Sequence, residues 1–200
     1  MSTKDGQAKE RILKAAEELF QVKGYHQVTV REIARKAGCS HTSIYVYYGE
    51  KRKLLELLAK KPLNELREDV RQILTKSSVT PSDRLVGLAK RFVHFGLVHR
   101  NLYEAFLHAE ATRVDIPTTL WELNDIRMQL FDMLKKAVAL NHQPWNEERV
   151  VSLSRMLYYA LHGMIMTYKD SDESIRSIER RVLPIVEQTV HVFLKGAIQS

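Results

Sequence analysis

Residues 30–48 read VREIARKAGCSHTSIYVYY, and this stretch decides the fold of the N-terminal part of the chain. Its apolar residues recur at three- and four-residue spacing, which predicts two short helices separated by a turn of three or four residues. Helices joined in this way cross at a steep angle, so small residues are needed where they meet. Ala34 permits close approach, Gly38 can adopt the positive φ of the turn, and Ile44 fills the angle between the helices. The spacing therefore predicts a helix-turn-helix.

Residues on either side of this stretch mark helix ends. Thr29 and Glu32 have the spacing of a capping box, in which each side chain accepts from the other residue's backbone N–H at a helix start. Gly24 and Gly38 suit the left-handed conformation that ends many helices. Ser40 is a good N-cap, so we expect the third helix to run from there to about Tyr47.

The rest of the chain also has helical periodicity, and no stretch alternates with period two for long. The pattern predicts further helices at 51–76, 82–99, 101–112, 117–141, 146–169 and 172–197. The expected fold is all-α, with about nine helices: a helix-turn-helix domain at 1–50 and a larger helical domain at 51–200. Pro62 falls inside one of these helices, where it would serve as a hinge or only kink the helix.

Composition limits what the chain can do. Its 200 residues are 44% apolar, enough for one or two compact domains. The net charge of +7 is uneven, because residues 1–61 hold 13 Lys and Arg against 7 Asp and Glu. This basic third predicts a polyanionic partner, and composition alone does not separate nucleic acid from a membrane surface. A single Cys39, no apolar run of about 18 residues and no signal peptide lead us to expect a cytoplasmic protein without a membrane partner.

A family resemblance covers roughly residues 9–58. The residues that carry it are Ile12-Leu13-Lys14-Ala15-Ala16, Leu19-Phe20, Gly24-Tyr25, Thr29-Val30, Ile33-Ala34, Ala37-Gly38, Ser40, Tyr45, Tyr47-Tyr48, Lys51 and Leu54-Leu55. This pattern closely resembles the tetracycline-repressor (TetR) family of bacterial transcription regulators. The resemblance implies a regulator, usually a repressor, that binds a palindromic operator in double-stranded DNA as a homodimer and is released by a small-molecule effector. The remaining two thirds match the family only in length and in helical character.

The resemblance also implies that the third helix enters the major groove with its N-terminal residues facing base edges. The expected DNA-binding residues are Thr29, Ser40, His41, Thr42, Ser43, Tyr45, Val46, Tyr47 and Lys51. The base-facing part has no Arg, Lys, Asn or Gln, so specificity should depend on His41 donating to a purine, on Thr42 and Val46 against thymine methyls, and on DNA shape. The tyrosines and the lysine are expected to hold phosphates. Tyr48 is assigned to the core and Tyr45 to the DNA-facing side.

A dimer is expected because one short helix contacts too few base pairs, so two copies should bind half-sites about 34 Å or more apart. The last two predicted helices are rich in apolar residues and would form a four-helix interface across a twofold axis, with Gly163 permitting close approach. The expected interface residues are Leu157, Ala160, Leu161, Gly163, Met164, Val182, Val186, Val190, Phe193 and Ala197. The alternative is that these helices form only the core of a monomer.

Aromatic and Met residues of the larger domain are candidates to line a pocket for a small, mostly apolar effector. They are Phe92, Phe95, His99, Tyr103, Phe106, Trp121, Met128, Phe131, Tyr158 and His162. The resemblance, rather than their spacing, is the reason to expect a ligand. Since the sequence has no phosphate-binding loop, zinc motif or nucleophile elbow, we expect no enzymatic activity, metal or cofactor. A nonspecific architectural DNA-binding protein and a helical small-molecule-binding enzyme are the alternative functions.

Overall fold

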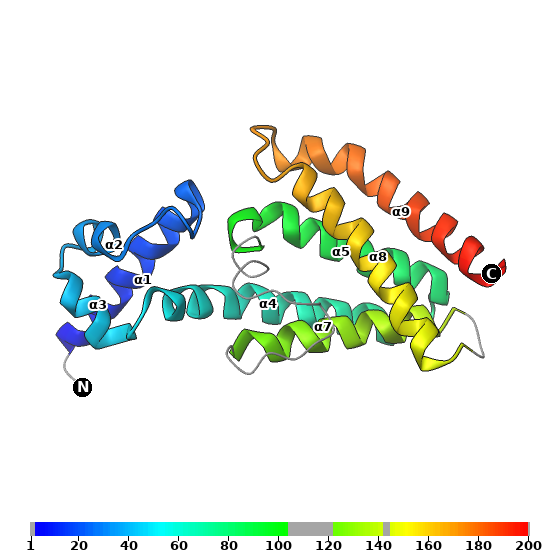
Figure 1. The fold of residues 1–200 in the computed structure, drawn as a ribbon, viewed down its shortest axis with the longest axis horizontal. Helices are drawn as coiled ribbons and strands as arrows, with labels where there is room; N and C mark the ends of the chain where they lie inside the picture. The colour runs from blue at the N-terminus through cyan, green and yellow to red at the C-terminus, as the bar shows by residue number, and fades with distance from the viewer. Residues whose placement is uncertain (1–2, 104–121, 142–144, 200) are drawn as a thin grey trace. The chain divides into compact units, whose positions relative to one another are not determined.

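The computed structural model describes residues 3–103, 122–141 and 145–199, and every regular element within these ranges is a helix (Figure 1). The N-terminal helices are α1 (Thr3–Lys23), α2 (Val30–Ala37), α3 (His41–Tyr48) and α4 (Lys51–Thr75). The later helices are α5 (Pro81–Val98), α7 (Glu122–Ala139), α8 (Glu147–Thr167) and α9 (Ile175–Gln199), and residues 100–103 are also helical. The predicted all-α fold class is confirmed.

Helix ends follow local capping, which is why the predicted and observed ends agree within three residues wherever both are described. Thr80 accepts from the Asp83 N–H at 3.1 Å and is followed by Pro81 in the first turn of α5. Asn146 accepts from the Arg149 N–H at 2.8 Å at the start of α8. Helix α4 continues through Pro62. The predicted residues 104–112 and 117–121 lie outside the described ranges.

The chain divides into two compact units. The described residues of unit 1 are 3–62, 101–103 and 122–123, and those of unit 2 are 63–100, 124–141 and 145–199. The division falls within α4, directly after Pro62.

Unit 1 contains the crossed short helices. In it α1 packs against α2, and α2 packs against α3 (Figure 1). Its buried apolar side chains include Ile12, Ala16, Phe20, Val28, Ile33, Ala34, Ile44, Leu54 and Leu55. Because these residues come from all four helices and from the loop before α2, the orientation of α3 is set by a shared core.

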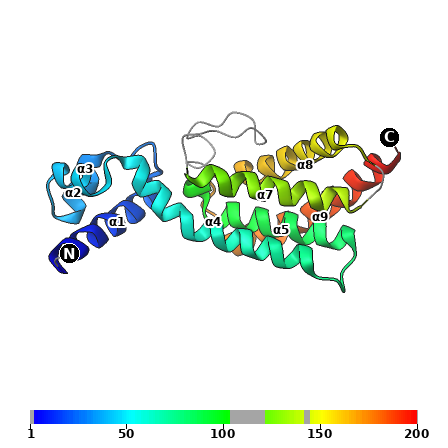
Figure 2. The same ribbon diagram turned by 90° about the horizontal axis from the view of Figure 1, so that it is seen from below.

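Unit 2 is built around α5, which packs against both α8 and α9 (Figures 1 and 2). Helices α5 and α8 pack tightly at Gly96, where a Cβ atom would lie 2.5 Å from the Ile165 Cδ1. An ion pair between Lys90 and Glu187 at 2.5 Å ties α5 to α9, and a hydrogen bond joins His94 Nδ1 to Glu179. Among the helices that the structure describes, none has the length and apolar character needed to cross a bilayer.

Candidate nucleic-acid interface

Helix α2 begins with the capping box that the sequence predicts. The Thr29 N–H donates to Glu32 Oε2 at 2.8 Å, and the Glu32 N–H donates to Thr29 Oγ1 at 3.2 Å. The Lys23 ammonium donates to Glu32 Oε1 at 2.7 Å, and this bond, together with those from Thr29, lowers the pKa of Glu32 to about 2. The Thr29 hydroxyl is therefore part of the cap. The DNA contact predicted for Thr29 would use the same hydroxyl group.

The turn between α2 and α3 is made by Gly38, whose φ of 66° and ψ of 42° are left-handed. The Cys39 N–H donates to the Ala34 carbonyl at 3.0 Å, which closes the end of α2. Ala34 and Ile44 are both buried, and Ile44 is 0% exposed. These positions match the predicted packing of a helix-turn-helix.

Helix α3 turns one side chain inward and presents most of the others outward. Ser40 caps it, since its hydroxyl accepts from the Ser43 N–H at 3.1 Å, and the two hydroxyls are 2.9 Å apart. His41 and Thr42 are exposed, as are Tyr45 at 52% and Val46 at 75%, while Ser43 is half-buried. Ile44 holds this short helix in place, and the exposed tyrosine and valine leave its outer face accessible to a partner.

The last residues of α3 contact the first turns of α1. The Tyr48 hydroxyl donates to the Lys9 carbonyl at 2.7 Å, and burial raises the pKa of Tyr48. The Tyr47 hydroxyl donates to Asp5 Oδ1 at 3.0 Å, and this hydrogen bond raises the pKa of Tyr47. Tyr48 is thus half-buried against α1 and agrees only in part with its assignment to the core.

Lys51 faces the inside of unit 1. Its ammonium donates to the carbonyls of Tyr25 and Val28, both at 2.9 Å, and lies 4.1 Å from the centre of the Tyr25 ring. Burial lowers the pKa of Lys51. The sequence analysis expected this lysine to hold phosphates, and that contact stays a prediction beside the carbonyl contacts. Two of its three N–H donors hold the loop before α2, which leaves one for a phosphate.

Sequence reasoning omitted two arginines on the outer face of α2. Arg31 and Arg35 are both exposed and lie one turn apart, opposite the buried Ile33, Ala34 and Ala37. Their four-residue spacing was the available signal, because it places them on one face of the helix. The first helix of a helix-turn-helix crosses the DNA backbone, so these side chains are additional phosphate candidates.

The structure brings together four of the predicted effector-site residues in unit 2. The Tyr158 ring of α8 lies 5.8 Å from the ring of Phe92, 6.5 Å from that of Phe131 and 6.0 Å from the parallel ring of His162. Phe131 is buried, and the other three rings are half-buried. We call these four residues the aromatic cluster. It joins α5, α7 and α8.

The other predicted effector-site residues lie outside the aromatic cluster as we define it. Phe95 packs on His99 with ring centres 5.0 Å apart, and burial lowers the pKa of His99. Tyr103 is buried and belongs to unit 1, whereas Met128 is half-buried in unit 2. Phe106 and Trp121 lie outside the described residues.

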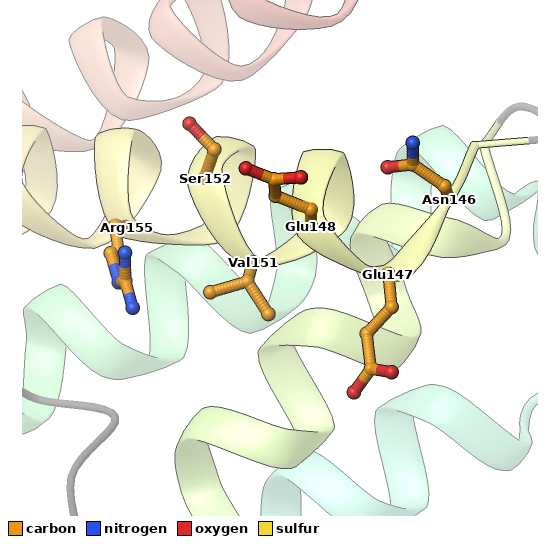
Figure 3. A pocket seen from close by; sticks show the side chains of 6 residues that line it. All are labelled: Asn146, Glu147, Glu148, Val151, Ser152 and Arg155. Atoms are coloured by element: carbon orange, nitrogen blue, oxygen red, sulfur yellow. The ribbon is translucent and has the colours of Figure 1, made fainter.

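An open hollow of about 830 Å³ lies at the start of α8 (Figure 3). Its lining residues are Asn146, Glu147, Glu148, Val151, Ser152 and Arg155. None of them was predicted to bind an effector. Since five of the six are polar or charged, this surface does not suit the apolar ligand expected from the sequence.

Most of the predicted dimer residues lie in the core of the subunit itself. Six of them are buried within one chain: Leu157, Leu161, Val182, Val186, Val190 and Ala197. Met164 and Phe193 are half-buried, while Ala160 and Gly163 are exposed. A side chain buried in its own subunit has little surface left for a partner, so the predicted interface needs correction.

The outward face of α8 and α9 is offset from the predicted one. On α8 it presents Met156, 58% exposed, Tyr159, 52% exposed, and the exposed Ala160 and Gly163. On α9 it presents Ile185, 49% exposed, and Val192, 65% exposed. We call these six residues the outer stripe. No atom of the described chain, apart from neighbouring residues of α8, lies within 4 Å of where a Gly163 Cβ would be.

Residues 12–58 match the family model described as bacterial regulatory proteins, tetR family. The chain is 30% identical over 83 residues to the uncharacterized HTH-type transcriptional regulator YdgC of Bacillus subtilis (strain 168), covering 42% of this chain and 43% of that protein. It is 31% identical over 88 residues to the fatty acid metabolism regulator protein of the same organism, covering 44% of each. The chain thus matches less than half the length of these curated relatives.

One solved structure extends the likeness beyond the helix-turn-helix. The crystal structure of a TetR-family transcriptional regulator from Bordetella parapertussis 12822 has a TM-score of 0.67 to this fold and covers 96% of both chains at 21% identity. At this identity the likeness shows a shared fold. Residues 12–58, which span α2, α3 and parts of α1 and α4, therefore match the DNA-binding region of the tetR family of bacterial regulatory proteins, and the described chain has a TetR-like fold.

Proposed function

We propose that this protein is a sequence-specific transcriptional repressor that binds a palindromic operator as a homodimer and is released by a small apolar effector. The observation that carries the proposal is the outward face of α3, where His41, Thr42, Tyr45 and Val46 are exposed on a helix held by Ile44. A recognition helix needs this combination of a fixed backbone and free outer side chains. We expect the protein to act in the cytoplasm, because a bacterial operator lies there.

The chemistry of α3 favours a particular form of base recognition. His41 can donate to a purine acceptor, and Thr42 and Val46 can contact thymine methyl groups. Each contact is weaker than a bidentate Arg–guanine pair, so DNA shape should contribute to specificity. Affinity would come from phosphate contacts by Tyr45, Lys51 and the arginines of α2.

The homodimer is proposed to form through the outer stripe of α8 and α9. Exposed large apolar side chains on two helices that pack against each other support this, because such surface is often covered by a partner. Isologous packing would pair each stripe with its symmetry mate in a four-helix arrangement. Gly163 would allow the two copies of α8 to approach closely.

The effector is proposed to contact the aromatic cluster. Its rings come from three helices, so a ligand between them would change how α5, α7 and α8 pack. A ligand that prefers the conformation unable to bind DNA lowers DNA affinity by that preference, and a coupling of about 1–3 kcal/mol corresponds to about 5- to 150-fold. Fatty acids should be among the first candidates, since one relative is named as a fatty acid metabolism regulator.

Selection of bound sequences from random DNA with the purified protein tests the proposal. The selected palindrome should bind about a thousandfold or more tighter than a scrambled duplex, and log affinity should fall steeply with log salt concentration. Equal affinity for both duplexes would refute sequence-specific regulation and favour an architectural DNA-binding protein. Thermal stabilisation by candidate compounds identifies the effector separately.

A further inference from the structure

Two adjacent tyrosines at the end of α3 are held by two residues one turn apart on α1. Tyr48 donates to the backbone carbonyl of Lys9, and Tyr47 donates to the carboxylate of Asp5. The Lys9 ammonium lies 5.7 Å from the centre of the Tyr47 ring. Because the Tyr48 bond fixes α1 against the end of α3, the carboxylate one turn earlier is held beside the Tyr47 hydroxyl.

This arrangement conflicts with a phosphate contact by Tyr47. A phenol has one hydrogen to donate, and here that hydrogen goes to Asp5. A phosphate oxygen would require the same hydrogen. In addition, the exposed Asp5 carboxylate places a negative charge beside the helix proposed to enter DNA, within a segment of net charge +6. Charge repulsion and competition for the hydroxyl therefore act in the same direction.

We propose that Asp5 limits DNA affinity by competing with the DNA backbone for the Tyr47 hydroxyl. In the free protein the carboxylate occupies the position that a phosphate would take. On binding, Tyr47 exchanges Asp5 for a phosphate oxygen, so part of the gain from the new bond is offset by loss of the old one. The effect is independent of base sequence, because the competing acceptors are the Asp5 carboxylate and a backbone phosphate, and neither differs from one base pair to another. This inference rests on the proposed DNA-binding function.

The test compares Asp5→Ala with wild type in fluorescence-anisotropy titrations on the selected operator at one fixed salt concentration. Removal of the competing carboxylate should tighten binding by about two- to tenfold, for the operator and for scrambled DNA alike. Asp5→Asn keeps a neutral acceptor and should give a smaller increase. Glu17→Gln removes one negative charge from an exposed site three turns further along α1, and is the matched control. It should change affinity less than Asp5→Asn.

The Tyr47→Phe background separates competition from simple charge repulsion. Without the hydroxyl, Asp5→Ala should raise affinity by clearly less than it does in the wild type. An equal increase in both backgrounds, or no increase in the wild type, would overturn the inference and leave the repressor proposal standing. A wild-type protein that selects no DNA sequence would instead remove the proposed function itself. Circular dichroism of each variant verifies that α1 remains folded.

Discussion

Replacing Gly96 by Ala should destabilise unit 2, although Ala is the better helix former. An added Cβ would lie 2.5, 2.7 and 2.8 Å from the Cδ1, Cγ2 and Cγ1 atoms of Ile165. Ile165 is 1% exposed and β-branched, so it has almost no freedom to move aside. Overpacking of this kind costs about 1–3 kcal/mol, against about 1 kcal/mol gained from replacing Gly in a helix. The net expectation is a loss of about 0–2 kcal/mol in the free energy of unfolding, in place of the gain of about 1 kcal/mol expected at an open helical glycine.

Urea denaturation followed by circular dichroism at one protein concentration measures this loss. Gly196→Ala is the matched control, because its Cβ would meet no described atom within 4 Å beyond its own helix, and it should be neutral or stabilising by up to about 1 kcal/mol. Ile165→Ala alone should cost about 2–5 kcal/mol, and it should cost less in the Gly96→Ala background because the new methyl then has space. Equal stability of the two glycine variants, or strictly additive losses in the cycle, would refute the close-packing argument.

Three further predictions concern DNA recognition, acid stability and assembly. His41→Ala should change the base sequence selected from random DNA while the salt dependence of binding stays the same, because a base contact is lost and phosphate contacts remain; an unchanged sequence preference would remove His41 from base recognition. The folded-state pKa of Glu32 is about 2 against an ordinary 4.5, so its stabilising effect is present above pH 4.5 and is lost as the pH falls toward 2. Glu32→Gln should therefore lower the melting temperature at pH 7 and approach wild type at pH 3, and a constant difference would contradict this reading. Tyr159→Asp should convert the dimer to a folded monomer in analytical ultracentrifugation, because Tyr159 is exposed on the outer stripe. Leu157→Ala should instead lower the free energy of unfolding by about 2–5 kcal/mol, because Leu157 is buried within the subunit. A dimeric Tyr159→Asp protein would exclude the outer stripe as the interface.

Features set by neighbours in the chain could be read from the amino-acid sequence alone. Thr29 and Glu32 cap α2 because they are three residues apart, and Gly38 ends it because glycine accepts a positive φ. Ile44 is buried because its spacing from Ala34 and Gly38 places it between two crossing helices. These interactions need no distant partner, so sequence spacing was sufficient for the helix-turn-helix and for most helix ends.

Only the tertiary structure decided which side of each helix meets which neighbour. Helix α8 has apolar residues nearly all round, so periodicity did not separate the buried Leu157 from the exposed Met156. The close helix approach is at Gly96, and Lys51 turns inward to carbonyls that are 23 and 26 residues away in the chain. The contact between Asp5 and Tyr47 spans 42 residues. Such contacts depend on how whole helices pack, and the energy of packing depends on the shapes of both partners, which local spacing does not encode.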